Sequence, residues 1–144
     1  MNKIMRTKIV CLFLCIIILC SSCDSYFKKL DGIDFSVGWI NMPELTNLYY
    51  DYPDGGSCGV TEGRITDVYW NEQYILAKQC KMYNDSIKGY YIVKILPPVK
   101  KGVPYKKIGP LSEEEYIMKK KELGLDEQKM KHMNIFKNRI LWLW

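Results

Sequence analysis

The sequence predicts an α+β fold, in which an antiparallel β-meander sheet is followed by two C-terminal helices. Three segments rich in Ile, Val, Tyr and Trp predict the meander, because these residue types suit a pleated, half-buried surface. They span residues 64–70, 73–82 and 89–96. The links between them, of two and about six residues, are too short for a crossover, so we expect antiparallel pairing. Capping signals after residue 111 predict the helices.

The chain begins with the parts of an export signal. Residues 1–8 hold three basic residues and no acid, residues 9–20 are apolar throughout, and two serines follow. This order is typical of a secretory signal, and the apolar run is shorter than the roughly 20 residues that a membrane-spanning helix needs. The sequence Ser21-Ser22-Cys23 resembles a bacterial lipobox, in which the cysteine is acylated and becomes the N-terminus. Cys20 stands where this motif usually has Leu.

We therefore expect residues 1–22 to be a lipoprotein signal peptide and Cys23 to carry an acyl chain such as palmitate. The predicted location is the bacterial cell envelope, where the lipid anchors the protein to the inner or outer membrane, facing either the periplasm or the cell surface. Cleavage by an ordinary signal peptidase and an uncleaved anchor are the alternatives. Residues 23–34 are predicted to be a lipidated tether, and residues 35–144 a single small α+β domain whose length suits one core.

Further strands are expected before the meander, and a loop is expected after it. Residues 35–40 and 46–52 are strand candidates separated by a proline-containing breaker, and residues 57–62 predict a short third strand. Pro97-Pro98 ends the meander, because proline cannot donate a ladder hydrogen bond. Residues 99–110, with four lysines, are then expected to form a basic loop.

The two helices are predicted from their caps. Ser112 and Glu115 have the spacing of a capping box, acids occupy the first turn, and lysines occupy the last. Gly124 ends this helix, and Asp126 is the expected N-cap of a second one. The residues expected to pack inward are Tyr116, Ile117 and Leu123 in the first helix, and Met130, Met133 and either Ile135 or Phe136 in the second.

The charges are unevenly distributed along the chain, whose formal net charge is +5. Residues 23–72 hold nine acidic and three basic residues, whereas residues 73–111 hold eight lysines and one aspartate. Either the two segments face and neutralise each other, or they form a dipolar surface that orients a partner or an anionic membrane. Nucleic acid is not an expected partner, because the chain is predicted to be exported and carries no recognition motif.

Cys58 and Cys80 are the cysteines that remain once the signal is removed and Cys23 is acylated. An even number in an oxidising compartment favours a disulfide, which would contribute roughly 3 kcal/mol. Two buried free thiols are the alternative, because a bridge needs Cα atoms within about 7 Å of each other.

The sequence shows no constellation of catalytic or metal-binding residues. Residues 55–59 match G-x-S-x-G, the motif around the nucleophilic serine of some hydrolases, but turn residues rather than a strand precede Ser57. A nucleophile at Ser57 or Cys58 would also need a histidine as base, and His132 is the sole histidine. His132 lies on a lysine-rich segment and is expected to be solvated. One His and two scattered cysteines do not make a metal site, and no pair stands out among the 16 acids. We therefore expect a non-enzymatic protein without cofactor or metal.

Three stretches resemble a known family. They are VYWNEQYILAKQ (residues 68–79), GYYIVK (residues 89–94) and GPLSEEEYIMKKKELGL (residues 109–125). They are similar to an uncharacterised family of small bacterial lipoproteins, a domain of unknown function, over about half of the mature chain. The resemblance implies an envelope protein with no assigned activity, so it transfers no catalytic residue to this chain.

Two functions of different classes remain. The first is a non-enzymatic module that binds a protein partner, as an immunity-type inhibitor binds a toxin, through the sheet face or the apolar tail. In that tail Trp142 and Trp144 are the candidate contacts, and docking of the tail onto its own core is the alternative. The second is a carbohydrate or peptidoglycan binder that uses aromatic rings as stacking platforms. It requires exposed rings at Tyr49, Tyr50, Tyr52 and Tyr69.

Overall fold

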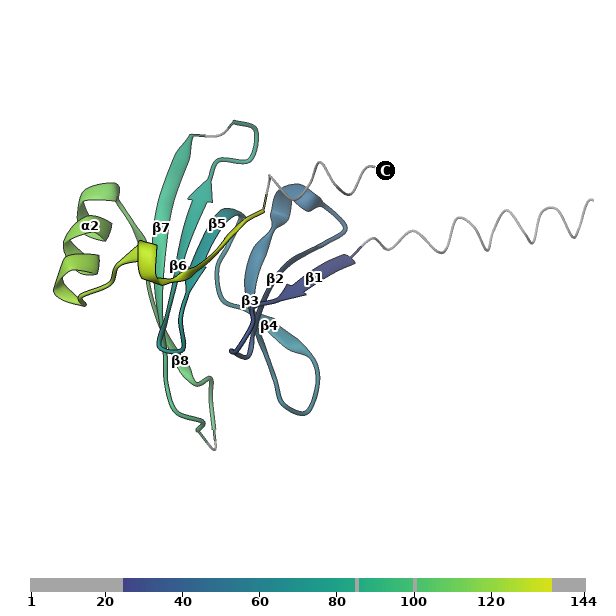
Figure 1. Cartoon of the computed structure of the whole chain (residues 1–144). Coiled ribbons are helices and arrows are strands. Elements are labelled where there is room, and N and C mark those ends of the chain that lie inside the picture. Colours follow the sequence, from purple (N-terminus) through teal and green to yellow (C-terminus); the bar gives the residue numbers. More distant parts are fainter. Residues whose placement is uncertain (1–24, 85, 100, 136–144) are drawn as a thin grey trace, which may run out of the picture.

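The computed structural model of the protein describes residues 25–84, 86–99 and 101–135, apart from the side chain of Pro43. These residues form a four-stranded sheet, a five-stranded sheet and one α-helix that covers the far face of the second sheet (Figure 1). The predicted α+β class is therefore wrong. The described part is mostly β, with two antiparallel sheets, one α-helix and two 3-10 turns. None of its helices is long and apolar enough to cross a membrane.

The predicted signal peptide (residues 1–22), the acylation site Cys23 and the tail residues Trp142 and Trp144 lie outside the described residues.

The first sheet has the strand order β1-β2-β3-β4. Its strands are β1 (Ser25–Lys29), β2 (Phe35–Ile40), β3 (Asn47–Asp51) and β4 (Ser57–Gly59). The three strand candidates upstream of the meander are confirmed as β2, β3 and β4. The breaker between the first two forms the 3-10 turn η1 (Pro43–Leu45).

The segment expected to be a tether belongs to this sheet from Ser25 onward. Every residue of β1 pairs with β2, beginning with Ser25 opposite Ile40. In the turn that follows β1, Leu30 and Ile33 are buried in the core. The sequence of this segment resembles a polar linker because β1 is an edge strand. Edge strands are commonly short and charged, so they lack a clear strand pattern.

The second sheet has the strand order β8-β7-β6-β5-β9, and each neighbouring pair is antiparallel. Its three central strands, β5 (Arg64–Trp70), β6 (Tyr74–Cys80) and β7 (Ile87–Ile95), are those predicted from the sequence. The edge strands, β8 (Tyr105–Leu111) and β9 (Lys131–Asn134), occupy segments for which the sequence predicted other structure.

The basic loop after the meander is therefore partly a strand, and the second C-terminal helix is absent from the described residues. β8 tolerates Pro110 and its lysines because one of its sides has no partner strand. Asp126 does cap a helical turn, but only the 3-10 turn η2 (Glu127–Lys129) forms. The next residues pair with β5, and burial of Met133 between exposed His132 and half-buried Asn134 follows the two-residue period of a strand.

The helix α2 (Glu113–Glu122) begins with the predicted capping box. The Glu115 N–H donates to the Ser112 hydroxyl at 3.3 Å, and the Ser112 N–H donates to the Glu115 carboxylate at 2.8 Å. Tyr116 is buried as predicted, but Ile117 is 55% exposed, so only part of the predicted packing face contacts the sheet.

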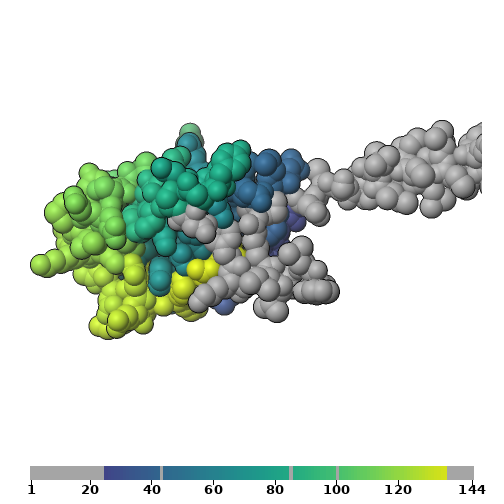
Figure 2. Space-filling view, turned by 90° about the horizontal axis from the view of Figure 1, so that it is seen from above, coloured from purple at the N-terminus to yellow at the C-terminus, as the bar shows by residue number. Residues whose placement is uncertain are grey.

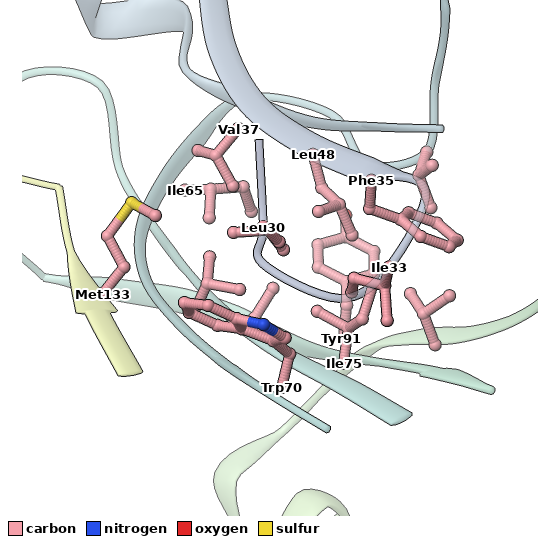
Figure 3. Close-up of a cluster of buried hydrophobic side chains, with 14 of the residues drawn as sticks. Leu30, Ile33, Phe35, Val37, Leu48, Ile65, Trp70, Ile75, Tyr91 and Met133 are labelled. Carbon is pink, nitrogen blue, oxygen red and sulfur yellow. The ribbon is translucent and has the colours of Figure 1, made fainter. Parts of the chain in front are cut away.

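The main core lies between the two sheets, and a smaller cluster lies beneath α2. Figure 3 shows side chains from both sheets in this core. Leu30, Phe35 and Leu48 come from the side of the first sheet, and they pack together with Trp70 and Tyr91 from the second sheet. The cluster beneath α2 consists of Leu76, Tyr90, Ile92, Tyr116 and Met130. The predicted inward residues Met130, Met133 and Ile135 are buried, although none of them lies on a helix. Met130 follows η2, Met133 lies on β9, and Ile135 follows β9.

Candidate functional site

A groove of about 250 Å³ lies between α2 and the outer face of the second sheet, and we call it the α2 groove. Its walls are mainly aromatic and aliphatic, and its rim carries charges of both signs. The lining residues are Tyr69, Leu76, Lys78, Tyr90, Glu113, Tyr116, Ile117, Lys120 and Glu127. A second groove, of about 400 Å³, is lined by Asp31, Gly32, Ile33, Trp70, Asn71, Glu72, Gln73, Lys129 and Lys131.

Strand register sets the wall of the α2 groove that the sheet provides. Tyr69 lies opposite Leu76, and Lys78 lies opposite Tyr90, so these four side chains share one face of the sheet. The other face of the same strands packs against the first sheet. The alternation that builds the core therefore also places this row of side chains under α2.

Two aromatic stacks fix the positions of these rings. Tyr90 stacks on Tyr116 of α2 with centroids 4.3 Å apart, and Tyr69 stacks on His132 of β9 at 4.2 Å. Lys120 Nζ lies 4.8 Å from the Tyr116 ring centroid, a cation–π distance. One face of each of the rings Tyr69 and Tyr90 is thus already covered by a neighbouring ring.

Two partly buried hydrogen bonds join residues that line the groove. Glu127 Oε1 accepts from the Tyr116 hydroxyl at 2.7 Å and from Lys120 Nζ at 2.5 Å. Burial opposes ionisation of Glu127, but these two hydrogen bonds and the charge of Lys120 together outweigh it and lower the pKa of its carboxyl. Burial, and then the bond to Glu127, raise the pKa of the Tyr116 hydroxyl. At neutral pH the pair is therefore a carboxylate and a protonated phenol.

A polar cluster around Asp67 lies beside the groove on the same face. The Asp67 carboxylate accepts from Asn134 Nδ2 at 2.7 Å, lies 3.2 Å from His132 Nε2 and forms an ion pair with Lys78 at 3.6 Å. The side chain of His132 is 41% exposed, so it contacts solvent as expected, but it also bonds to Asp67 and stacks on Tyr69. The cluster joins β9 to β5 and β6.

The structure does not bring together the other residues singled out from the sequence. Cys58 on β4 and Cys80 on β6 are not joined to each other, so the predicted disulfide is absent. The alternative of two buried thiols holds for Cys80, whereas Cys58 is half-buried. Cys58 Sγ lies 3.9 Å from the Tyr105 hydroxyl, and Cys80 Sγ lies 3.6 Å from Thr66 Oγ1. The two thiols lie in different sheets. Each thiol contacts a hydroxyl group and not the other thiol.

The aromatic platforms are only partly exposed. Tyr50 is buried, Tyr49 and Tyr69 are half-buried, and Tyr52 is 36% exposed. Tyr52 packs edge-on against Tyr50 at 5.1 Å. Within the described residues, no group of three or more His, Cys, Asp or Glu side chains is arranged to hold a metal ion.

Asp67, Lys120 and Glu127 are site residues that the sequence reasoning missed. Asp67 and Tyr69 alternate with Val68 along β5, and this alternation was the available signal for a shared outer face. Glu127 gave no such signal, because its partners are 11 and 7 residues away on α2 and meet it only in the folded chain.

Comparison with known proteins connects this site to a family. Residues 51–134, more than half of the chain, match a family model described as "Protein of unknown function (DUF3997)". Every residue that lines the α2 groove falls within this range, whereas the other groove also uses Asp31, Gly32 and Ile33. No curated protein and no solved structure matches the chain. The matched range favours the α2 groove as the candidate site.

Proposed function

The chain belongs to the DUF3997 family, whose function is unknown, and from this premise we propose that it is a bacterial envelope lipoprotein that binds a protein partner through the α2 groove. The proposed role is non-enzymatic. An inhibitor of the immunity type is one form that such binding takes.

The observation that carries the binding proposal is an exposed apolar side chain at the edge of the groove, Ile117, which is followed on α2 by the exposed Met118. Ile117 and Met118 are 55% and 64% exposed on α2, and Ile117 also lines the groove. Within the groove, Leu76, Tyr90 and Tyr116 form an apolar centre, and charged side chains of both signs also line it. The charged residues include Lys78, Lys120 and Glu113. An apolar centre with a charged rim is the usual anatomy of a protein–protein contact. The partner surface would place an apolar side chain in the groove between charged neighbours.

The state of the titratable groups also supports binding rather than catalysis. Glu127 is held by Tyr116 and Lys120, and Asp67 is held by Asn134, His132 and Lys78. Carboxylates bonded in this way fix the walls of the groove and are less available to accept a proton from a substrate. A preformed groove binds at a lower entropic cost than one that orders on contact.

The envelope location is supported by the sequence of the first 23 residues. A basic start, an apolar run and the lipobox-like Ser21-Ser22-Cys23 are the parts of a lipoprotein signal. The proposed anchor is an acyl chain on Cys23, in either the inner or the outer membrane. We also predict, from the sequence alone, that Trp142 and Trp144 in the tail contact the partner.

Carbohydrate binding has weaker support. Sugar-stacking sites need open aromatic faces, but Tyr50 is buried and Tyr69 is stacked on His132. Tyr52 is the exposed ring among the four candidates, and it contacts Tyr50 edge-on.

Site-specific photo-crosslinking in the bacterial envelope tests the binding proposal. A photoreactive residue replaces Ile117 in one strain and, as the matched control, Val99 in another, since Val99 is 50% exposed on the connection between β7 and β8. We expect a discrete protein adduct from position 117 and none from position 99. The purified partner is then expected to bind the Ile117→Asp, Met118→Asp double variant at least about tenfold more weakly, a loss of about 1.4 kcal/mol. Equal adducts from both positions, or unchanged binding by the variant, would overturn the proposal.

A further inference from the structure

Exposed apolar side chains gather at the end of the first sheet where the chain enters the fold. Ile40, the last residue of β2, is 52% exposed, and Met42 in the bend that follows is 45% exposed. Asn41 between them has φ +67°, a conformation that Asn tolerates, and the Met42 N–H donates to the Ile40 carbonyl at 2.8 Å. This bend keeps both apolar side chains at the surface.

Two aromatic rings lie directly beside this bend. Tyr26 on β1 pairs with Trp39 on β2, and their ring centroids are 4.7 Å apart. Trp and Tyr are the residues enriched where a membrane meets water, because each combines an apolar ring with a polar group. Tyr26 and Trp39 are half-buried, and they lie on the opposite face of the first sheet from Ile40, so these residues share the end of the sheet rather than one face. We call Tyr26, Trp39, Ile40 and Met42 the entry patch.

The entry patch is close in sequence to the proposed acylation site. Ser25 begins β1 opposite Ile40, and a single residue separates Ser25 from Cys23. Two residue steps span at most about 7 Å of extended chain. An acylated Cys23 lies at the boundary of headgroups and acyl chains, so Ser25 has to lie within about 7 Å of the lipid. Ile40 lies opposite Ser25 on the neighbouring strand, about 5 Å further away at most.

We propose that the entry patch contacts the lipid bilayer that holds the acylated Cys23, an inference that rests on the proposed lipoprotein anchor. A bilayer fits better than a protein partner, because the short connection leaves no room for another folded chain between the patch and the membrane. Ile and Met bury apolar area in the lipid, and Tyr and Trp are suited to the headgroup level.

This contact sets the orientation of the whole molecule. Figures 1 and 2 place α2 on the opposite side of the molecule from the start of β1. With the entry patch on the bilayer, the α2 groove faces away from the membrane, where a protein partner can reach it. The lipid contact thus defines which surface of the protein is available for binding.

The test uses the full, acylated chain in vesicles of phosphatidylethanolamine and phosphatidylglycerol. An environment-sensitive fluorophore is attached at Met42→Cys and, in a separate protein, at Ile40→Cys, both in a Cys58→Ser background because Cys58 is only half-buried. Met118→Cys on α2 is the matched control, since Met118 is also an exposed methionine. Quenching by lipids brominated on their acyl chains reports contact with the bilayer interior.

We expect the probes at 40 and 42 to be quenched about twofold or more above the probe at 118, because contact with the boundary of headgroups and acyl chains brings them near the bromines. Equal quenching at all three positions in acylated protein would overturn the lipid contact and leave the anchor intact. A mass spectrum that shows no acyl group on Cys23 would instead remove the anchor, and the inference with it. The two failures are therefore distinguishable.

Discussion

At the scale of single residues, Glu127 joins the parts of the α2 groove. Its carboxylate accepts hydrogen bonds from Tyr116 and Lys120, both on α2, while Glu127 itself lies on the segment that leads to β9. The helix and the chain after it are thereby held together on the sheet. None of these contacts was foreseen, because the three residues carry no local pattern that links them.

Replacing Glu127 with Gln is expected to lower the free energy of unfolding at pH 7 by about 0.5–1 kcal/mol. Tyr116 can still donate to the amide oxygen, and the lost pairing with Lys120 is partly screened by solvent. Since the folded-state pKa of Glu127 is lowered from 4.5, its contribution is present above that pH and is lost as the pH falls through the folded-state pKa. The difference between wild type and variant therefore shrinks in acid.

Urea unfolding at pH 7 and in acid measures this difference. Glu114→Gln is the control, because Glu114 is an exposed acid in the first turn of the same helix. A stability difference for Glu127→Gln that grows as the pH falls would contradict the assignment of the hydrogen bonds.

The two cysteines, which are not joined by a disulfide, give a second prediction at this scale. Cys58 is half-buried and Cys80 is buried, so a water-soluble alkylating reagent is expected to modify Cys58 in the folded protein and Cys80 only after unfolding. Peptide mass mapping without reductant measures both. A protein in which neither thiol reacts until a reductant is added would show that the bridge forms after all.

At the scale of elements, α2 is attached through a narrow contact. Tyr116 is the buried residue of the helix and stacks on Tyr90, whereas Ile117 beside it is exposed. Tyr116→Ala is expected to cost about 3 kcal/mol, because it removes a buried ring and the bond to Glu127. Ile117→Ala is expected to change the unfolding free energy by about 0.5 kcal/mol or less, as is usual at the surface.

Thermal or urea unfolding of the two variants checks this contrast. Equal losses of stability would mean that the two side chains pack equally, contrary to the structure. We expect Ile117→Ala to weaken partner binding and leave stability unchanged. That result would assign partner binding to Ile117 and attachment of the helix to Tyr116.

The elements that the sequence predicted are those with strong local or alternating signals. The capping box of Ser112 and Glu115 depends on residues three apart, and β5, β6 and β7 are dense in β-forming residues. The missed strands β1, β8 and β9 are all sheet edges, where short length, lysines and a proline hide the pattern. Asp126 is a true cap, but pairing with β5 is what fixes the residues after its single turn.

At the scale of the whole molecule, two sheets share one core that begins earlier in the chain than the sequence indicates. Leu30 is fully buried between the sheets, next to residues of both. The packing of the sheets on each other was not predictable, because it depends on contacts between segments far apart in sequence. The alternation in β5 and β7 nevertheless indicated which residues share a face of each strand, whereas the pattern in β6 was less clear.

Leu30→Ala tests where the fold begins. A buried leucine that is truncated to alanine costs about 2–5 kcal/mol, whereas a residue in a flexible tether costs almost nothing. Ile40→Ala is the matched control, because Ile40 is an aliphatic residue on the strand that pairs with β1 and is 52% exposed. Urea unfolding with equal midpoints for Leu30→Ala and wild type would show that the fold starts after residue 30.

The anchor on Cys23 connects the proposed location, the orientation on the membrane and the accessibility of the α2 groove. It is tested most directly by mass spectrometry of the N-terminal peptide of the protein purified from bacterial membranes. We expect a peptide that begins at Cys23 and carries the added mass of acyl chains, and a Cys23→Ala variant that no longer fractionates with membranes. An unmodified N-terminus at any other residue, with membrane association kept in the variant, would contradict the lipoprotein proposal.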